Sequence, residues 1–453
     1  MSSKFRNAGR ALAQWLVGNP AARMVYRFVP RAIRHGLLAT LDPNVIPPRG
    51  LAFGPLPEPL PGPATTPIGT IIEIPRAGEP GVNVFGHLHG EFGLAESARR
   101  YASALIAAGV PVALNDLDHD VPHAFGDTTM GGDTRQGTPY PTNLVFVSPD
   151  YMQRAMNSIG QNAPDGKATI GCWFWELEDV PSAWREPIAR IDAIMVASRF
   201  TEEAFRRATD KPVFRVPLPV ADVPASSATR ADFGLPADAF VFLASFDFNS
   251  SIHRKNPIAA IDAFQRAFPL ERNDVRLVVK SSNGHRYPRD LARLVEYSAR
   301  DPRILVRDQV LPGAHMRALQ RCCDAYVSLH RAEGFGLGLA ECMAIGKPVI
   351  GTAWSGNMDF MNADNSCLVD YALVPVAEGQ YPHGAGTRWA EPDPVSAAGW
   401  MQRLVDDADF AATIGARAAR DIRGTLSPAA AAQAAVQGLQ RLEAANKEGP
   451  CPG

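Results

Sequence analysis

The 453-residue sequence lacks several features that would place it in a specialised class of protein. No apolar run reaches the ~20 residues that a membrane-spanning helix needs. The first residues show neither the apolar core nor the cleavage site of a secretory signal, so we expect a cytoplasmic protein. The six cysteines form no C-x-x-C pair, which favours free thiols over disulfides or a zinc site. A net charge of −2 gives no indication of a nucleic-acid partner.

Acidic residues are also missing from the start of the chain. No Asp or Glu precedes Asp42, whereas Lys and Arg recur among apolar residues throughout residues 1–41. This pattern predicts a basic amphipathic helical arm that lies on an anionic membrane surface, or that packs on its own domain or a second subunit. Residues 42–69 contain nine prolines, which disfavour regular elements and predict a linker.

The sequence contains enough apolar residues to form a large hydrophobic core. Hydrophobic residues make up 46% of the chain, and its length predicts two to three domains. Residues 82–114 read as strand, glycine-bearing loop, helix and strand, the start of a Rossmann-like half. The loop is not a G-x-G-x-x-G, so a nicotinamide cofactor is disfavoured. Two histidines in it, His87 and His89, are candidates for substrate contact or are ordinary polar groups.

A tryptophan cluster follows the next strands of this half. Trp173, Trp175 and Trp184 surround Glu176, an arrangement that suits stacking on sugar rings while the carboxylate accepts a hydroxyl. The same cluster is equally typical of core packing. Trp173 and Glu176 are therefore candidate acceptor residues with a structural alternative.

The second half begins with a buried strand over residues 240–246. Arg254 and Lys255 follow it just before a helix start, where two cations predict a diphosphate clamp; a solvated basic turn is the alternative. Lys280 ends the next strand and is a weaker candidate for a phosphate or base contact.

The most informative stretch is residues 324–370. A short apolar strand leads into Glu333 and three closely spaced glycines, and a helix with Glu341 follows. A glycine-rich turn at a helix start points several backbone amides, and the positive end of the helix dipole, at one place that suits a phosphate. The flanking carboxylates suit hydroxyls of a sugar and of a ribose. Glycines that serve packing alone in a strand–helix crossover are the alternative.

The string from Glu333 to Glu341, E-G-F-G-L-G-L-A-E, is similar to the E-x7-E motif of the retaining GT-B glycosyltransferases of group 1, which are family-4-like enzymes of bacterial glycan synthesis. The continuation E-C-M-A-I-G-K-P-V-I-G-T resembles the same family. This resemblance implies an α/β GT-B fold, with two Rossmann-like domains facing across a cleft. On that basis we expect an acceptor domain over residues 70–225, a nucleotide-sugar domain over 226–425, and a last helix and tail over 426–453.

The resemblance also implies roles for individual residues. Lys255 and Arg254 would neutralise the leaving diphosphate, although Asp247 stands where many relatives have a further arginine. The amides of the glycine-rich turn would receive the distal phosphate, the two glutamates would hold the transferred sugar and the ribose, and the first-domain glycine loop would approach the donor. The residues so implied are, as catalytic groups, Glu333, Lys255 and Arg254, and, as donor-binding groups, Glu341, Phe335, Gly336, Leu337 and Gly93. Lys280 joins the donor-binding candidates through its place at the end of a strand alone.

The implied reaction moves a hexose from a nucleotide diphosphate sugar to a hydroxyl with retention of configuration. We expect neither a metal nor a cofactor, because no D-x-D motif stands in a convincing loop. The basic arm favours a glycan or lipid-linked acceptor at the inner face of the cytoplasmic membrane, as in surface polysaccharide synthesis. Two alternatives are a GT-B nucleotide-sugar 2-epimerase, which would need no acceptor, and a non-catalytic sugar-nucleotide-binding scaffold, which the intact glutamates and cations disfavour.

Overall fold

The computed structural model describes residues 50–57, 81–117, 121, 123–131, 133–159, 167–220 and 225–448. The predicted basic arm, residues 1–41, lies outside the described residues, as does most of the predicted linker. Residues 50–57 run along the second domain without forming a helix or strand. Their backbone bonds to the end of β9 (Ile304–Asp308) and the residue after it. The Asp308 amide donates to the Leu51 carbonyl at 2.9 Å, and the Phe53 amide donates to the Gln309 side chain at 3.0 Å.

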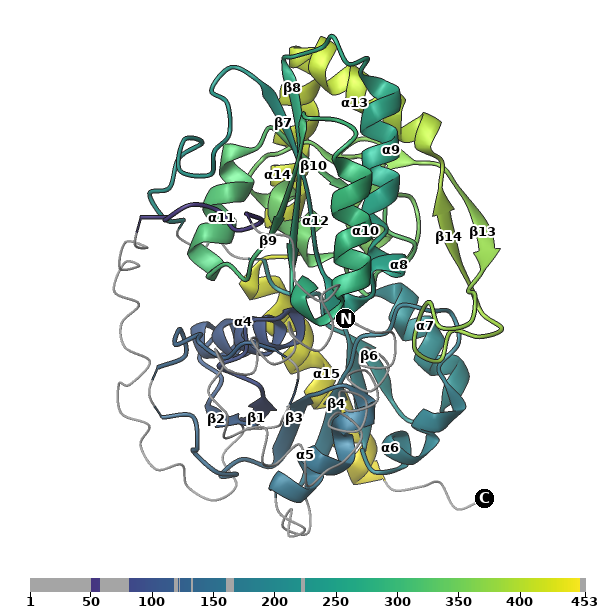
Figure 1. The fold of residues 1–453 in the computed structure, drawn as a ribbon. Helices are drawn as coiled ribbons and strands as arrows, with labels where there is room; N and C mark the ends of the chain where they lie inside the picture. Colours follow the sequence, from purple (N-terminus) through teal and green to yellow (C-terminus); the bar gives the residue numbers. More distant parts are fainter. Residues whose placement is uncertain are drawn as a thin grey trace, which may run out of the picture.

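The first domain is built on a six-stranded parallel sheet, the lower body in Figure 1. Its strand order is β2-β1-β3-β4-β5-β6. Strands β1, β3 and β5 are buried throughout and β2 and β4 at all but one residue, as expected when helices cover both faces of a parallel sheet. The strands are β1 (Val82–Gly86), β2 (Val112–Asp116), β3 (Thr142–Phe146), β4 (Ala168–Cys172), β5 (Ala193–Val196) and β6 (Val213–Arg215).

One helix of this domain begins at a side-chain cap. The Ser198 side chain accepts a hydrogen bond from the Thr201 amide and caps α7. The helices are α4 (Gly93–Ala107), α5 (Met152–Ile159), α6 (Arg185–Ala189) and α7 (Arg199–Ala208), with short 3₁₀ turns η2 (Pro149–Tyr151) and η3 (Ser182–Trp184).

The second domain repeats the plan with a second six-stranded parallel sheet, ordered β12-β11-β10-β7-β8-β9. Two sheets of this kind confirm the predicted α/β architecture of paired Rossmann-like domains (Figure 1). The strands are β7 (Phe240–Asp247), β8 (Val275–Ser282), β9 (Ile304–Asp308), β10 (Ala325–Ser328), β11 (Val349–Thr352) and β12 (Cys367–Val369). The helices and 3₁₀ turns are η4 (Phe248–Ser250), α8 (Ile252–Lys255), α9 (Pro257–Ala267), η5 (Gly284–Arg286), α10 (Pro288–Ser298), α11 (Gly313–Cys322), α12 (Leu337–Ala344), η6 (Gly356–Asp359), α13 (Pro394–Asp406) and α14 (Ala408–Thr425).

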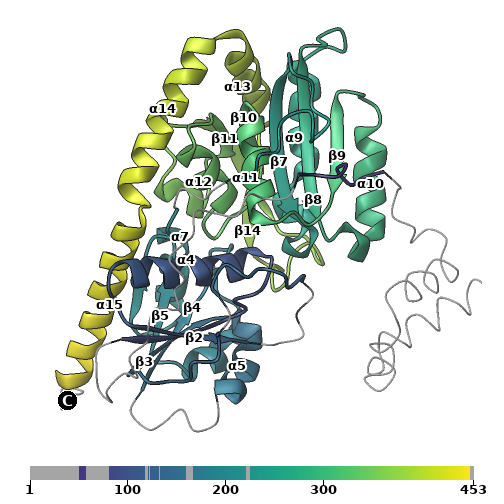
Figure 2. The same cartoon turned by 90° about the vertical axis from the view of Figure 1, so that its left-hand side faces the viewer.

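The last helix joins the two domains. Helix α14 packs against α12 of the second domain, and α15 (Pro428–Glu448) packs against α4 and β6 of the first. Figure 2 shows the two helices as a yellow column that runs past both sheets. Gly438 permits the close approach, because a Cβ at that position would lie 2.4 Å from the ring of Phe214 in β6.

The region from Tyr371 to Pro394 differs from the irregular segment that its sequence suggests. It forms an antiparallel hairpin of β13 (Tyr371–Pro375) and β14 (Arg388–Pro392) that projects from the second domain toward the first (Figure 1). Strand β13 is apolar in sequence, Tyr-Ala-Leu-Val-Pro, yet it is mostly exposed, so it is an edge hairpin strand and not a buried strand of the central sheet.

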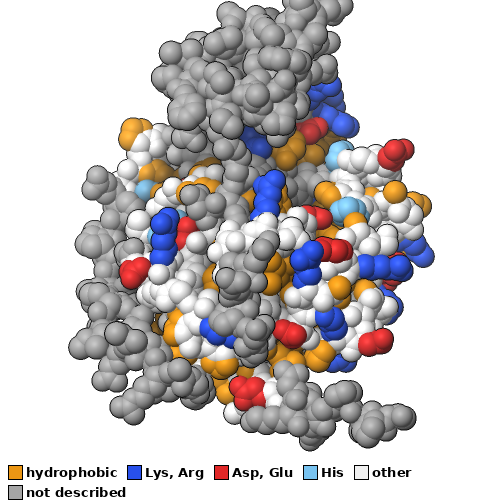
Figure 3. Space-filling model, turned by 90° about the horizontal axis from the view of Figure 1, so that it is seen from below, with side chains coloured by type: hydrophobic (Ala, Val, Ile, Leu, Met, Phe, Trp, Pro, Cys, Tyr) orange, Lys and Arg blue, Asp and Glu red, His pale blue; other side chains and the backbone are white. Residues whose placement is uncertain are grey.

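Three apolar clusters fill the body, and two of them continue from the first domain into the second. The outer surface is mixed in charge. Figure 3 views the molecule from the side of the first domain, and acidic and basic side chains are interspersed over the described part of that face. No helix among the described residues combines the length and the apolar character that crossing a membrane requires.

Candidate functional site

The candidate site lies where the carboxyl ends of the two sheets meet. Ser198, directly after β5, donates from its hydroxyl to the Gly334 carbonyl after β10 at 2.6 Å. Glu176, in the loop after β4, lies 3.6 Å from the Arg254 guanidinium that follows β7. Ligands of open α/β sheets bind outside the carboxyl ends of the strands, so these contacts mark the cleft between the domains as the place for a ligand.

The glycine-rich turn between β10 and α12 is shaped by close packing. Gly336 caps α12 with a φ of +97°, a conformation that favours glycine. At Gly338 a Cβ would lie 2.6 Å from the Tyr326 hydroxyl, so no larger residue fits there without movement. The backbone amides of the first helical turn have no acceptor within the helix and are available to an anion.

Hydrogen bonds with Ser355 and Gly356, at the start of η6, hold the glycine-rich turn. The Glu333 amide donates to the Ser355 hydroxyl at 2.8 Å, and the Gly356 amide donates to the Glu333 carbonyl at 2.9 Å. A Cβ on Gly356 would lie 2.3 Å from the Gly334 carbonyl oxygen. The backbone on either side of Glu333 is therefore fixed before any ligand arrives.

Three of the predicted catalytic residues form one buried charge cluster. The Glu333 carboxylate pairs with the Lys255 ammonium through one oxygen and with the Arg254 guanidinium, at 3.2 Å, through the other. Burial raises the pKa of Glu333, but the two cations lower it more, to about 2. Burial likewise lowers the pKa of Lys255 more than Glu333 raises it. The unliganded cluster thus holds an ionised carboxylate between two cations.

Tyr381 is a member of this cluster that the sequence did not reveal. It lies in the loop of the β13–β14 hairpin and donates from its hydroxyl to Glu176 at 2.5 Å, while its ring centre is 5.7 Å from the Arg254 guanidinium carbon. Burial raises the pKa of Tyr381 well above its ordinary value, which keeps the donating proton in place. Because the hairpin resembles a loop in sequence, no motif indicated that Tyr381 would reach the cleft.

Glu341 lies on the other flank of α12 and already has several partners. Its carboxylate accepts from Arg100 of α4 at 2.5 Å and from Gln320 at 2.9 Å, and it forms an ion pair with Arg317 of α11 at 2.6 Å. Glu96 also pairs with Arg100, at 2.6 Å. A carboxylate accepts about four hydrogen bonds, so acceptor positions remain on Glu341 for a ribose hydroxyl. The sequence did not indicate that Arg100, from the other domain, would meet Glu341.

The remaining predicted donor residues are spread around the cleft. Gly93 is the first residue of α4 and has open space where a Cβ would point. The Phe335 side chain is buried and packs on Phe360 with ring centres 5.1 Å apart, so only its backbone can serve a ligand. Leu337 begins α12, and Lys280 lies buried in β8.

Two of the predicted acceptor residues hold loops within the first domain. His87 is buried, and its Nδ1 lies 2.8 Å from the Leu117 carbonyl. His89 uses both ring nitrogens, with Nδ1 2.8 Å from the Asp127 carbonyl and Nε2 3.1 Å from the Thr134 hydroxyl. Both imidazole rings are therefore hydrogen-bonded within the first domain.

Trp173 requires a correction. It is 1% exposed and packs against Phe205 in the first-domain core, so it has no free ring face for a sugar. The core alternative holds for this residue because its position directly after β4 turns the indole inward. Glu176, three residues later, does reach the cleft.

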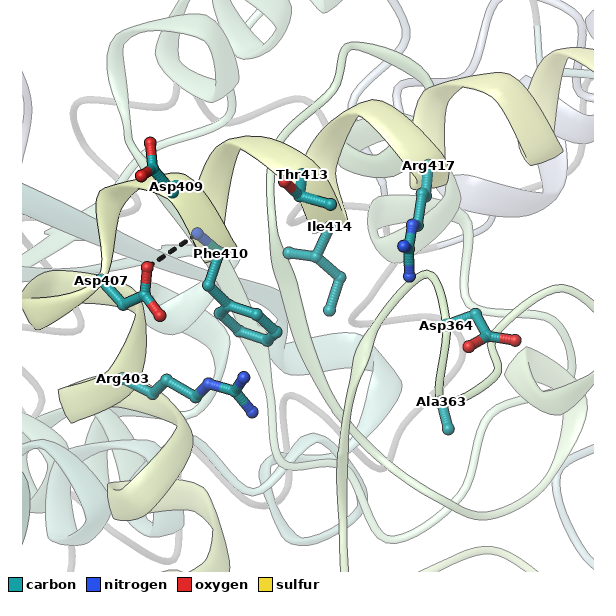
Figure 4. Close-up of a pocket in the computed structure, with 9 residues that line it drawn as sticks. All are labelled: Ala363, Asp364, Arg403, Asp407, Asp409, Phe410, Thr413, Ile414 and Arg417. Atoms are coloured by element: carbon teal, nitrogen blue, oxygen red, sulfur yellow. Dashed lines mark hydrogen bonds between the residues drawn. The ribbon is translucent and has the colours of Figure 1, made fainter.

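Two cavities lie outside this cluster. One of about 430 Å³ opens between the segment before β12 and the start of α14, and none of the predicted site residues lines it (Figure 4). Its charged groups have structural partners: Asp407 caps α14, and the Arg403 guanidinium lies 3.6 Å from the centre of the Phe410 ring. A second cavity, of about 600 Å³, lies between the domains, where α7 of the first domain faces Phe335 and η6 of the second. No group of three or more metal-ligating side chains occurs within the described part of the chain.

Two facing parallel-sheet domains with a ligand site between them define the GT-B class of fold, as predicted. Within it, residues 242–377 match the family model described as "Glycosyl transferases group 1". The match covers the glycine-rich turn, both glutamates and the two cations. The second domain therefore carries the sequence signature of that family.

Comparison with known proteins agrees with this assignment of the fold. D-inositol 3-phosphate glycosyltransferase of Kineococcus radiotolerans is 29% identical over 214 residues, which are 45% of this chain and 45% of that protein. This chain thus matches less than half the length of that relative.

Solved structures cover more of the molecule. Sucrose-phosphate synthase from Thermosynechococcus elongatus superposes with a TM-score of 0.56 at 16% identity, over 80% of this chain and 99% of that one. Anabaena HepE, solved in complex with UDP and glucose, gives 0.55 at 14% identity over 80% of this chain and all (100%) of its own. At such identities the likeness shows the shared fold.

Proposed function

We propose that the protein is a retaining glycosyltransferase that moves a hexose from a nucleotide diphosphate sugar to a hydroxyl of a glycan or lipid-linked acceptor. The observation that carries the proposal is the start of α12, whose free amides lie between Glu333 and Glu341 within a sequence matched by group 1 glycosyl transferases. Amides suit a diphosphate, and the carboxylates suit the hydroxyls on either side of it.

In this proposal the first-turn amides of α12, from Phe335 to Leu337 onward, receive the distal phosphate of the donor. Glu333 accepts hydroxyls of the transferred sugar, and Glu341 accepts from the ribose. Arg254 and Lys255 are already oriented by Glu333, so they can neutralise negative charge as it develops on the leaving diphosphate. Preorganised charge of this kind lowers a barrier without reorganisation during the reaction.

Glu176 is the residue that we assign to the acceptor side. It comes from the first domain, and its link to Arg254 brings it next to the proposed sugar position. A carboxylate there accepts a hydrogen bond from the attacking hydroxyl. The proposed reaction needs no metal, because the cations and the helix start supply the positive charge.

Titration of the protein with UDP-, GDP- and ADP-sugars, followed by unfolding temperature, tests the donor. A ligand at ~100 times its Kd stabilises by about 2.7 kcal/mol, which a thermal shift detects. Incubation of the best donor with candidate acceptors, with and without EDTA, then reports transfer, and NMR of the product reports its anomeric configuration. The absence of any stabilising nucleotide sugar would refute the proposal. A rearranged nucleotide sugar formed without acceptor would instead indicate an epimerase.

We further propose that residues 1–41 bring the enzyme to an anionic membrane surface, where a lipid-linked acceptor of surface polysaccharide synthesis would be found. The support is the one-sided charge of this segment. Co-sedimentation with phosphatidylglycerol vesicles should fall when residues 1–41 are deleted. Equal binding by the deleted and full-length proteins would contradict this part of the proposal.

A further inference from the structure

The loop between β13 and β14, residues 376–387, docks on the first domain. Its first residue, Val376, is buried and belongs to the same apolar cluster as Trp175 and Trp184 of the first domain. Further along the loop, the His383 ring lies 3.7 Å from the Asp150 carboxylate and 6.3 Å, between ring centres, from Trp184. The hairpin therefore carries residues of the second domain across the cleft to the first (Figure 1).

Tyr381, in this loop, is held by contacts within the second domain. The carbonyl of its neighbour Gln380 accepts a hydrogen bond from the Ser251 hydroxyl at 2.8 Å. The same hydroxyl accepts from the Arg254 amide, at 3.4 Å, where α8 begins. The Tyr381 ring centre lies 5.7 Å from the Arg254 guanidinium carbon, within the range of a cation–π contact. These contacts hold Tyr381 beside Arg254 independently of the first domain.

Glu176 of the first domain meets both residues. Its Oε2 accepts from the Tyr381 hydroxyl at 2.5 Å, and its Oε1 lies 3.6 Å from the Arg254 guanidinium. A short hydrogen bond to a carboxylate is charge-assisted, so it restrains the carboxylate more firmly than the longer contact does. A carboxylate accepts about four hydrogen bonds, so the bond from Tyr381 leaves Glu176 able to accept one from the hydroxyl of an acceptor.

Arg254 does not orient Glu176 by itself. Its Nη1 donates to the Ala332 carbonyl at 2.9 Å and to Glu333 at 3.2 Å, and its Nε donates to the Ser250 carbonyl at 3.2 Å. The contact from its Nη2 to Glu176, at 3.6 Å, is longer than a hydrogen bond. The Tyr381 hydroxyl therefore supplies the directional contact that sets the rotation of the Glu176 carboxylate.

We infer that Tyr381 is a positioning residue of the acceptor site, which holds the Glu176 carboxylate in the orientation that accepts the attacking hydroxyl. The inference rests on the proposed function, and it makes the acceptor site a joint product of the two domains. Tyr381 acts on the acceptor hydroxyl through Glu176, while the groups around α12 bind the nucleotide of the donor. Because a small misplacement of a reacting group costs a large factor in rate, the loss of this one orienting bond should be measurable.

Y381F tests this role, because it removes the hydroxyl and keeps the ring that packs beside Trp175 and Arg254. Y297F is the matched control. Tyr297 of α10 also donates its hydroxyl to a carboxylate, but to that of Asp262 in α9, within the second domain. Each variant loses one bond between a tyrosine and a carboxylate, so the two should show similar, small decreases in unfolding temperature.

Steady-state transfer by the full-length protein measures the effect. The donors are UDP-, GDP- and ADP-linked hexoses, the acceptors are octyl glucoside, octyl galactoside and octyl mannoside, and the best pair for the wild type is used throughout. We expect Y381F to lower kcat/KM for the acceptor by about tenfold or more, the usual effect of losing a hydrogen bond to a charged group. Calorimetric titration with the matching nucleoside diphosphate should give Kd values for Y381F and the wild type that agree within about twofold. Y297F should match the wild type in both measurements.

A double-mutant cycle shows whether Tyr381 acts through Glu176. E176A should itself lower kcat/KM for the acceptor. Adding Y381F to E176A should lower it further by less than about twofold, because the carboxylate that the hydroxyl positions is already gone. A tyrosine that only helped to hold the two domains together would instead lower the activity of E176A by the same factor as that of the wild type.

The outcomes separate the two proposals. Failure of the wild type to transfer a hexose to any of the three glycosides would overturn the proposed acceptor class and this inference together. If transfer occurs and Y381F matches the wild type, the proposed function stands and the role of Tyr381 is wrong. The same conclusion follows if Y381F loses as much affinity for the nucleoside diphosphate as it loses in kcat/KM for the acceptor, or if its full effect persists in E176A.

Discussion

Replacement of Glu333 by glutamine should reveal how much the buried charge cluster contributes to stability. The pKa of Glu333 falls from 4.5 to about 2, because its two cations outweigh the effect of burial. At about 1.4 kcal/mol per pKa unit, this shift corresponds to ~3 kcal/mol at pH 7. Removing one partner of a buried ion pair typically costs ~3–5 kcal/mol. Burial lowers the pKa of Lys255 more than Glu333 raises it, so the pair gives Lys255 no net stabilisation to add to this figure. We therefore expect E333Q to lower the free energy of unfolding by about 3 kcal/mol.

Urea denaturation at pH 7 measures the loss, and E391Q is the matched control. Glu391 likewise accepts two charge-assisted bonds, here both from Arg331, at 2.6 and 3.0 Å, but its side chain is 40% exposed. Exposed pairs contribute less than about 1 kcal/mol, so E391Q should be nearly as stable as the wild type. Equal stability losses in the two variants would refute the reasoning that burial makes the Glu333 cluster strong.

Acid titration of the same variants checks the direction of the Glu333 pKa shift. The folded pKa of Glu333 lies below its ordinary value, so its contribution is complete above about pH 4.5 and is lost as the pH falls to 2. The stabilities of the wild type and E333Q should therefore converge over that range. Parallel curves would show that Glu333 is not the titrating group.

Three further experiments test other parts of the structure. G356A places a Cβ 2.3 Å from a backbone oxygen of the glycine-rich turn, so urea denaturation should show a loss of at least about 2 kcal/mol. The control G399A lies at an open helical position and should be neutral or stabilise by up to ~1 kcal/mol. A double-mutant cycle of R100M and E341Q should give a coupling above about 1 kcal/mol, and additive losses would mean that the interdomain ion pair contributes nothing. W173F should lower stability by on the order of 1–3 kcal/mol through a core cavity; unchanged stability with impaired transfer would instead place Trp173 at the acceptor.

Part of the fold and of the candidate site follows from local sequence. Buried parallel strands are short apolar runs, and the glycines and proline around α12 mark its start and end, so the alternation of strands and helices was readable along most of the described chain. The same reading placed Lys255 and Glu333, 78 positions apart, at the ends of two strands, and the parallel sheet brings them into contact. Parallel strands aim their carboxyl ends at one edge, which is why residues so distant converge predictably.

What the sequence could not decide is which side chains meet across the two domains. Arg100 reaches Glu341 over 241 positions, and Tyr381 reaches Glu176 over 205, in each case because the domains close on each other. The orientation of Trp173 relative to Glu176 also depends on how the chain turns after β4. The sequence by itself determined the elements and the chemistry at each strand end, since those depend on neighbours along the chain. Only the tertiary structure decided which charges are already paired, since that depends on neighbours in space, as the contacts of Glu333 with Arg254 and Lys255 and of Glu341 with Arg100 show.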